Sequence, residues 1–132
     1  MSTNTARAVM VAGSLARLSY ALGMLLAPHT MNRLQLAAAT RDNAIATMTT
    51  RAFGAVNANV ALLTLRAAFL DRDKRLALGL NITTDFGDLI ATLLEWRDGD
   101  LGRGPMLASV ALQSAGMATW TTVLRTERRD LG

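Results

Sequence analysis

Polar residues at helical spacing between Asn81 and Glu95 restrict most strongly what this chain can fold into. They recur at i, i+4, i+7, i+11 and i+14, which places them within an arc of about 80° on one helix face. The other positions are mostly apolar or small, whereas a helix that lies on water is normally about half polar. We therefore predict a helix embedded in apolar surroundings, with a narrow acidic face turned inward. The members of this acidic face are Asn81, Asp85, Asp88, Thr92 and Glu95.

Four segments of the chain have the length and composition of long helices. Alanine and leucine are abundant, and only 2 prolines occur among 132 residues, which favours helix over sheet. The expected helices cover residues 6–27, 43–69, 76–96 and 105–124. Because the connections are short, successive helices should run antiparallel. The predicted fold is all-α: a single domain over residues 1–132, forming a four-helix, up-down-up-down transmembrane bundle.

The first connection is the longest and has mixed composition. Pro28 ends the first helix because proline cannot continue it. Within this connector, which runs from Pro28 to Asp42, a short helix could form at a membrane surface from Met31, Leu34, Leu36 and Ala37 to Ala39. Thr40 or Asp42 is the expected N-cap of the second helix. After the last helix, the tail that begins at Arg125 is expected to be solvated and loose.

The last helical segment gives the strongest indication of a membrane. No charged residue occurs between Arg103 and Arg125, and about 20 uncharged residues span a bilayer. In the second segment, Gly54 and Ala58 form a small-xxx-small pair that allows close helix approach. A soluble, alanine-rich bundle is the alternative, and the mean hydropathy of +0.24 is modest for four spans. Arg17 interrupts the first apolar segment, which favours a retained helix over a cleaved signal peptide.

Basic residues are distributed unevenly between the two ends of the predicted bundle. The N-terminus, the second loop and the tail carry Arg7, Arg66, Arg72, Lys74, Arg75, Arg125, Arg128 and Arg129. The other end carries Arg33, Arg41, Arg97 and Arg103. Positive charge is concentrated on the cytoplasmic side of membrane proteins. We therefore expect a multi-pass protein of the cell inner membrane with both termini in the cytoplasm. Its partners would be the lipid bilayer and other membrane proteins or further copies of the chain.

Four charged residues lie within the predicted spans, where charge is costly. Arg17 and Arg51 are expected to contact Asp85 and Asp88 across the bundle, because two cations and two anions balance. The network could serve only to fix helix pairing. Alternatively, it could line a polar cavity in which the two aspartates act as acid and base. The candidate catalytic residues are Asp85 and Asp88, and the candidate binding residues are Arg17, Arg51, Asn81 and Gln113.

Several functions find no support in the residues. The chain has no cysteine and 1 histidine, so a transition-metal site is not expected, and no cofactor is predicted. His29 follows Pro28 at a helix end and is expected at the membrane interface. Although the net charge is +4, the basic residues form no stripe with interleaved aromatics, so nucleic acid is not an expected partner.

Short motifs resemble a known group of proteins. They are an arginine in the first segment, R-x-F-G at Arg51, Phe53 and Gly54, and D-x-x-D at Asp85 and Asp88. Over about residues 12–124, this pattern resembles the small four-helix bacterial membrane proteins of a DoxX-like group of uncharacterised function. The resemblance implies a four-span bundle. Members of that group often carry a further charged residue after R-x-F-G, where this chain has Val56, Asn57 and Ala58.

Three functions remain open on the sequence. The first is a small integral membrane protein that acts as an accessory or interaction subunit. The second is a membrane-embedded acid–base enzyme that acts on an isoprenoid or lipid-like substrate. The third is a small oligomeric transporter. An enzyme needs an open pocket that reaches Asp85 or Asp88, whereas a packing network should be dry, closed and fully paired.

Overall fold

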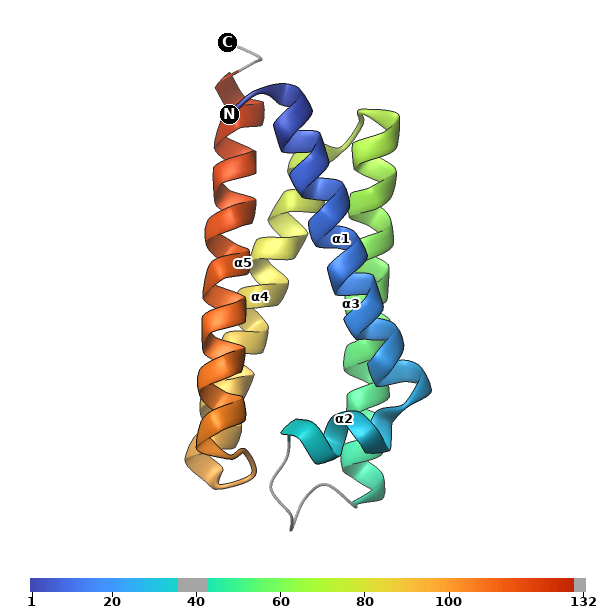
Figure 1. The fold of residues 1–132 in the computed structure, drawn as a ribbon, viewed down its shortest axis with the longest axis vertical. Coiled ribbons are helices and arrows are strands. Elements are labelled where there is room, and N and C mark those ends of the chain that lie inside the picture. The colour runs from blue at the N-terminus through green and yellow to red at the C-terminus, as the bar shows by residue number, and fades with distance from the viewer. Residues whose placement is uncertain (36–42, 130–132) are drawn as a thin grey trace.

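The computed structural model describes residues 1–35 and 43–129, which form five α-helices and no β-strand (Figure 1). The all-α class is confirmed. Four of these helices are long, and the fifth is a short helix in the first connection that includes Met31 and Leu34, where a short helix was expected. The helices are α1 (Thr3–Leu26), α2 (Pro28–Gln35), α3 (Ala44–Leu70), α4 (Lys74–Asp98) and α5 (Arg103–Arg129).

The helix starts follow local sequence signals. Ser2 caps α1, and its hydroxyl accepts a hydrogen bond of 3.2 Å from the amide three residues later. Asn43 caps α3 by accepting a hydrogen bond of 2.9 Å from the amide two residues later. The prediction of Thr40 or Asp42 as this N-cap is therefore wrong, and both residues lie outside the described part of the chain.

The helix α5 extends beyond its predicted end at Leu124 and continues to Arg129. Glu127 holds the last turns, because its two carboxylate oxygens accept hydrogen bonds of 3.2 and 3.3 Å from Lys74 Nζ. Lys74 also pairs with Asp71 in the α3–α4 turn, and its hydrogen bond lowers the pKa of the Asp71 carboxyl. The expected loose tail is thus helical up to Arg129 because a distant part of the chain supplies its partner.

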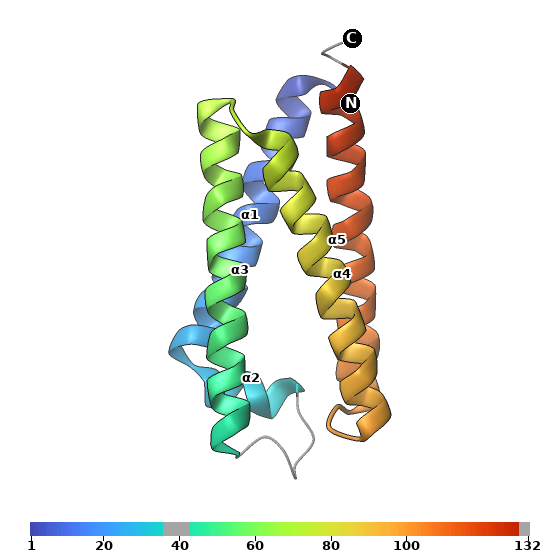
Figure 2. The same ribbon diagram turned by 180° about the vertical axis from the view of Figure 1, so that it is seen from behind.

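The four long helices form two pairs that meet at one end and separate towards the other (Figure 1, Figure 2). Helix α1 packs against α3, and α4 packs against α5. Successive long helices run in opposite directions, so the start of α1, the end of α5 and the α3–α4 turn lie at the end where the pairs meet (Figure 1). We call this the closed end. Helix α2 lies at the opposite end, which we call the α2 end.

The main hydrophobic cluster lies towards the closed end. Four of its eight buried members are alanines, so the helix backbones can approach closely there. The indole of Trp120 lies against Gly13 of α1, where a Cβ atom would be only 2.5 Å from Trp120 Cη2. The buried members of this cluster are Ala6, Met10, Ala67, Ala68, Ala77, Leu78, Trp120 and Val123.

Gly54 allows α3 to touch α1. A Cβ atom at this position would lie 2.9 Å from the Ala21 carbonyl oxygen and 2.9 Å from Met24 Cβ. The small residue expected to permit close helix approach therefore does so, and its neighbour is α1.

Two helices are long and apolar enough to cross a membrane. The mean hydropathy of an 18-residue window reaches 1.6 in α1 and 1.4 in α3. Helices of this kind also form the cores of soluble proteins, where they are mostly buried, and occur as N-terminal signal sequences. In the described residues α4 and α5 do not reach the same hydropathy, because α4 carries charges and α5 carries many serines, threonines and glycines.

Replacing Gly54 with alanine should weaken the α1–α3 contact, because the added methyl group would overlap backbone as well as side-chain atoms. Overpacking of this kind costs about 1–3 kcal/mol. Gly79→Ala is the matched control, because nothing lies within 4 Å of a Cβ there and alanine stabilises a helix by about 0.5–1 kcal/mol. The unfolding temperature of purified protein should fall in G54A and hold or rise in G79A. Equal stability of G54A and wild type would contradict this packing.

Candidate functional site

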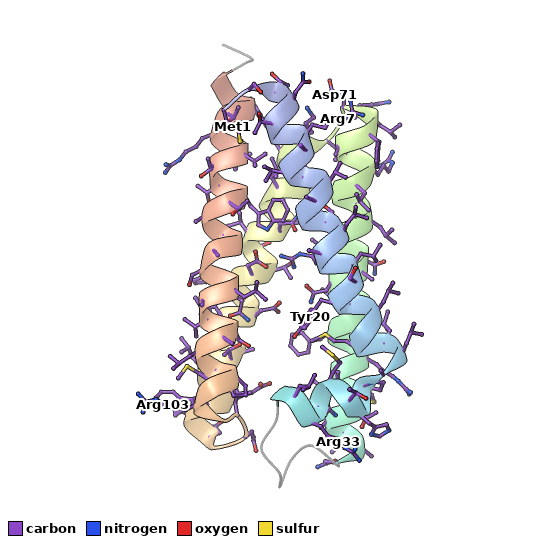
Figure 3. All side chains as sticks on the ribbon, viewed as in Figure 1. Met1, Arg7, Tyr20, Arg33, Asp71 and Arg103 are labelled. Atoms are coloured by element: carbon purple, nitrogen blue, oxygen red, sulfur yellow. The ribbon has the colours of Figure 1, made fainter. Side chains whose placement is uncertain are left out.

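A cavity of about 650 Å³ lies between the two helix pairs. It begins beside Gly13 and Trp120 and extends to Asn43 and Asp100 near the α2 end. Its volume falls within the range of roughly 300–1,000 Å³ that is typical of small-molecule sites. Tyr20 of α1 is one of its lining residues and points into the space between the pairs (Figure 3).

An ion pair between Arg17 of α1 and Asp85 of α4 crosses from one helix pair to the other. The two side chains are only 10% and 7% exposed. The same guanidinium donates a second hydrogen bond, of 2.7 Å, from Nη1 to Asn57 Oδ1 on α3. Asn57 is itself oriented by donating to the Phe53 carbonyl at 3.1 Å. Arg17 thus links three helices, because its guanidinium carries several N–H donors in a fixed fork. The predicted contact between Arg17 and Asp85 is present.

The second oxygen of Asp85 has a different environment. Oδ2 is buried and accepts no hydrogen bond from the described residues. It faces Gly116 of α5, where a Cβ atom would lie 2.6 Å away, so glycine leaves room for the carboxylate. The indole of Trp120 lies within electrostatic reach of the same group. Leaving a buried acceptor unpaired is costly, so this oxygen marks a position where a donor from a ligand would be stabilised.

The acidic face continues from Asp85 towards the α2 end. Asp88 and Glu95 are half-buried and line the cavity. Arg17 and Asn57 lie within electrostatic reach of Asp88. In residues 1–35 and 43–129, however, no cation forms an ion pair with Asp88 or Glu95. The predicted pairing of Asp88 with an arginine is therefore limited to a longer-range interaction.

The two predicted polar binding residues have separate locations. Gln113 of α5 lines the cavity and donates to Thr92 Oγ1 at 3.2 Å, while its Oε1 is buried without a partner. Asn81 lies outside the cavity lining, fully buried between α3 and α4. Its Nδ2 donates to Thr64 Oγ1 at 2.6 Å and to the Ala77 carbonyl at 2.8 Å. Gln113 thus belongs to the site, whereas Asn81 links α3 and α4 towards the closed end.

Arg51 does not take part in the charged network. Its side chain is exposed, it is not among the cavity residues, and no described residue pairs with it. The prediction that Arg51 contacts the aspartates is therefore wrong. Arg51 lies six positions before Asn57 on α3. At about 100° per residue its side chain therefore points about 120° away from the face that meets Arg17. Asn57 is the α3 contribution that sequence reasoning missed, although its polarity within an apolar segment was visible.

The charges that line the cavity are mostly negative. Four carboxylates and one guanidinium are present among the lining residues. Within the described ranges, no group of three or more histidine, aspartate or glutamate side chains is close enough to hold a metal ion. The cationic residues are Arg17 alone, and the anionic residues are Asp85, Asp88, Glu95 and Asp100.

The Arg17–Asp85 pair should be energetically coupled. Breaking a buried pair leaves one charge uncompensated, which costs about 3–5 kcal/mol. Arg17→Gln and Asp85→Asn should each lower the free energy of unfolding, and the double variant should cost clearly less than the sum. Arg17→Gln with Asp88→Asn is the control cycle, and its coupling should be smaller. Denaturant titration in detergent measures the free energy of unfolding for every variant of both cycles. If the losses of Arg17→Gln and Asp85→Asn simply add in the double variant, the pair does not stabilise the protein.

Comparison with models of protein families, with curated proteins and with solved structures found no match for this chain. The resemblance to the DoxX-like group therefore stays a prediction from the short motifs, and the argument for function rests on the geometry of the cavity.

Proposed function

We propose that this chain is a small integral membrane protein that binds a small molecule in the cavity between its helix pairs. The observation that carries this proposal is the cavity of about 650 Å³, whose lining includes Asp85, Asp88 and Glu95. A network that only fixed helix pairing should be dry and closed, with every acid oxygen paired. The geometry around Asp85 favours a binding site instead.

The distribution of apolar side chains supports insertion into a membrane. Only 22% of the apolar window of α1 and 39% of that of α3 is buried inside the protein. A core helix of a soluble protein would be mostly buried. Large apolar side chains also face outward on α4 and α5, where water would make their exposure unfavourable. Examples are Phe86, Ile90, Leu93, Leu94 and Leu107.

The arrangement of the ends supports one orientation. The start of α1, the end of α5 and the α3–α4 turn lie at the closed end (Figure 1). The basic residues counted along the sequence are more numerous at this end. We therefore propose an inner-membrane protein with the closed end in the cytoplasm and the α2 end on the opposite side. A complex with other membrane proteins, or with further copies of the chain, would cover part of the apolar surface.

Acid–base catalysis in the same cavity is the second candidate function. Asp85 offers a free carboxylate oxygen, and Asp88 lies one helical turn away. Two neighbouring carboxyl groups can take different protonation states. An isoprenoid or lipid-like substrate would suit the surroundings. A transporter would need a second opening, whereas the buried cluster at the closed end fills the space opposite the cavity.

The absence of cysteine from the natural chain allows a direct test. Ser109 and Ser114 both lie on α5, and Ser109 lines the cavity whereas Ser114 is exposed on another face. A thiol reacts as its thiolate, which forms in water and not in lipid. In native membranes, Ser109→Cys should react with a small water-soluble maleimide, and Ser114→Cys should react much more slowly.

Each result of this experiment bears on one part of the proposal. Fast reaction at both positions, together with release of the protein by alkaline carbonate, would contradict membrane insertion. No reaction at either position would contradict a cavity open to water. Ala61→Cys is the packed control, because Ala61 is fully buried outside the cavity, and it should stay unreactive until the protein is unfolded.

A further inference from the structure

We infer that the cavity takes an amphiphile with a cationic head group, such as a primary or quaternary amine attached to an apolar chain. This inference rests on the proposed function, because it names the class of ligand that the same cavity would bind. The head group would lie against the acidic face of α4. The apolar chain would extend among the apolar residues of the lining.

The cavity lining carries an excess of negative charge that the described residues do not balance. Arg17 pairs with Asp85, which leaves Asp88 and Glu95 without an ion pair in the described part of the chain. These groups lie on one face of α4, and the step from Asp85 to Glu95 covers about 15 Å along the helix axis. Carboxylates at membrane depth require a counterion. A bound cation would supply it.

A buried carboxylate oxygen of Asp85 gives support that does not depend on this charge count. The side chain of Asp85 is only 7% exposed, and among the described residues its Oδ2 accepts no hydrogen bond of ordinary geometry, although the Trp120 indole acts on this carboxyl. Asp85 is among the residues that line the cavity. An ammonium group carries three N–H donors and no acceptor, so a primary amine would satisfy Oδ2. A quaternary amine would be held by charge alone.

The length and the apolar lining of the cavity indicate what the rest of the ligand would be. The cavity is long, reaching from Trp120 in the middle of the molecule to Asn43 near the α2 end. A simple inorganic cation would leave most of this space unfilled. An apolar chain would match the aliphatic, thioether and aromatic side chains that line it. These residues are Met24, Ile45, Phe53, Leu101 and Leu112.

Two thiol reagents of opposite charge test the sign of the electrostatic potential in the cavity. Ser109→Cys would be treated with a methanethiosulfonate that carries a trimethylammonium group and with one that carries a sulfonate. The cation should react faster by a factor on the order of ten, relative to the same ratio at the exposed control Ser2→Cys. Adding Asp88→Asn and Glu95→Gln should return the ratio to that of the control.

Competition then tests the amphiphile itself. Decyltrimethylammonium, decanol and decanoate would each be added below micelle-forming concentrations, and Ser109→Cys would be labelled with a neutral maleimide. Only the cationic compound should slow labelling severalfold, and Asp88→Asn with Glu95→Gln should abolish this protection. Equal protection by decanol would overturn the requirement for a cation.

The outcomes separate the inference from the function on which it rests. If Ser109→Cys reacts with neither charged reagent nor with the maleimide, the cavity itself is refuted. If it reacts with both charged reagents at the control ratio, the cavity stands and the cationic ligand is refuted. Preference for the sulfonate would assign the site to anions through Arg17. Circular dichroism of the Asp88→Asn, Glu95→Gln variant confirms that a lost preference does not come from unfolding.

Discussion

The buried contact between Arg17 and Asp85 is the interaction on which the arrangement of the helices depends. It joins the α1–α3 pair to the α4–α5 pair, and through Asn57 it also fixes the position of α3. A guanidinium and a carboxylate removed from water are stable only when they remain together. Relative sliding or rotation of the two pairs would separate them. The contact therefore sets the register of the bundle at the inner limit of the cavity.

The packing on either side of this contact differs because the side chains differ in size. Towards the closed end, alanines and Gly13 let the backbones approach, and Trp120 fills the remaining space. Towards the α2 end, the pairs diverge (Figure 2), and the cavity lies between them. The cavity is thus a consequence of tight packing on one side of the ion pair and separation on the other.

The outer surface carries many exposed leucine, isoleucine and phenylalanine side chains. The cavity between the pairs has carboxylates, amides and one guanidinium among apolar lining residues. Under the proposed function, lipid would solvate the outer surface and an amphiphile would fill the cavity. The ion pair of Lys74 with Glu127 joins α4 to α5 within one pair near the closed end.

The sequence by itself determined the helical class, the approximate extents of the long helices and the acidic face of α4, and it predicted that Arg17 would pair with an aspartate of that face. These features follow from periodicity within a segment and from the cost of an isolated charge in apolar surroundings. Only the tertiary structure decided that Asn57, rather than Arg51, completes the network, and that Asn81 links α3 and α4 outside the cavity. The reason is that contacts between helices depend on their relative rotation and separation, which no single segment encodes. The divergence of the helix pairs, and with it the cavity, is a property of all four long helices packed together.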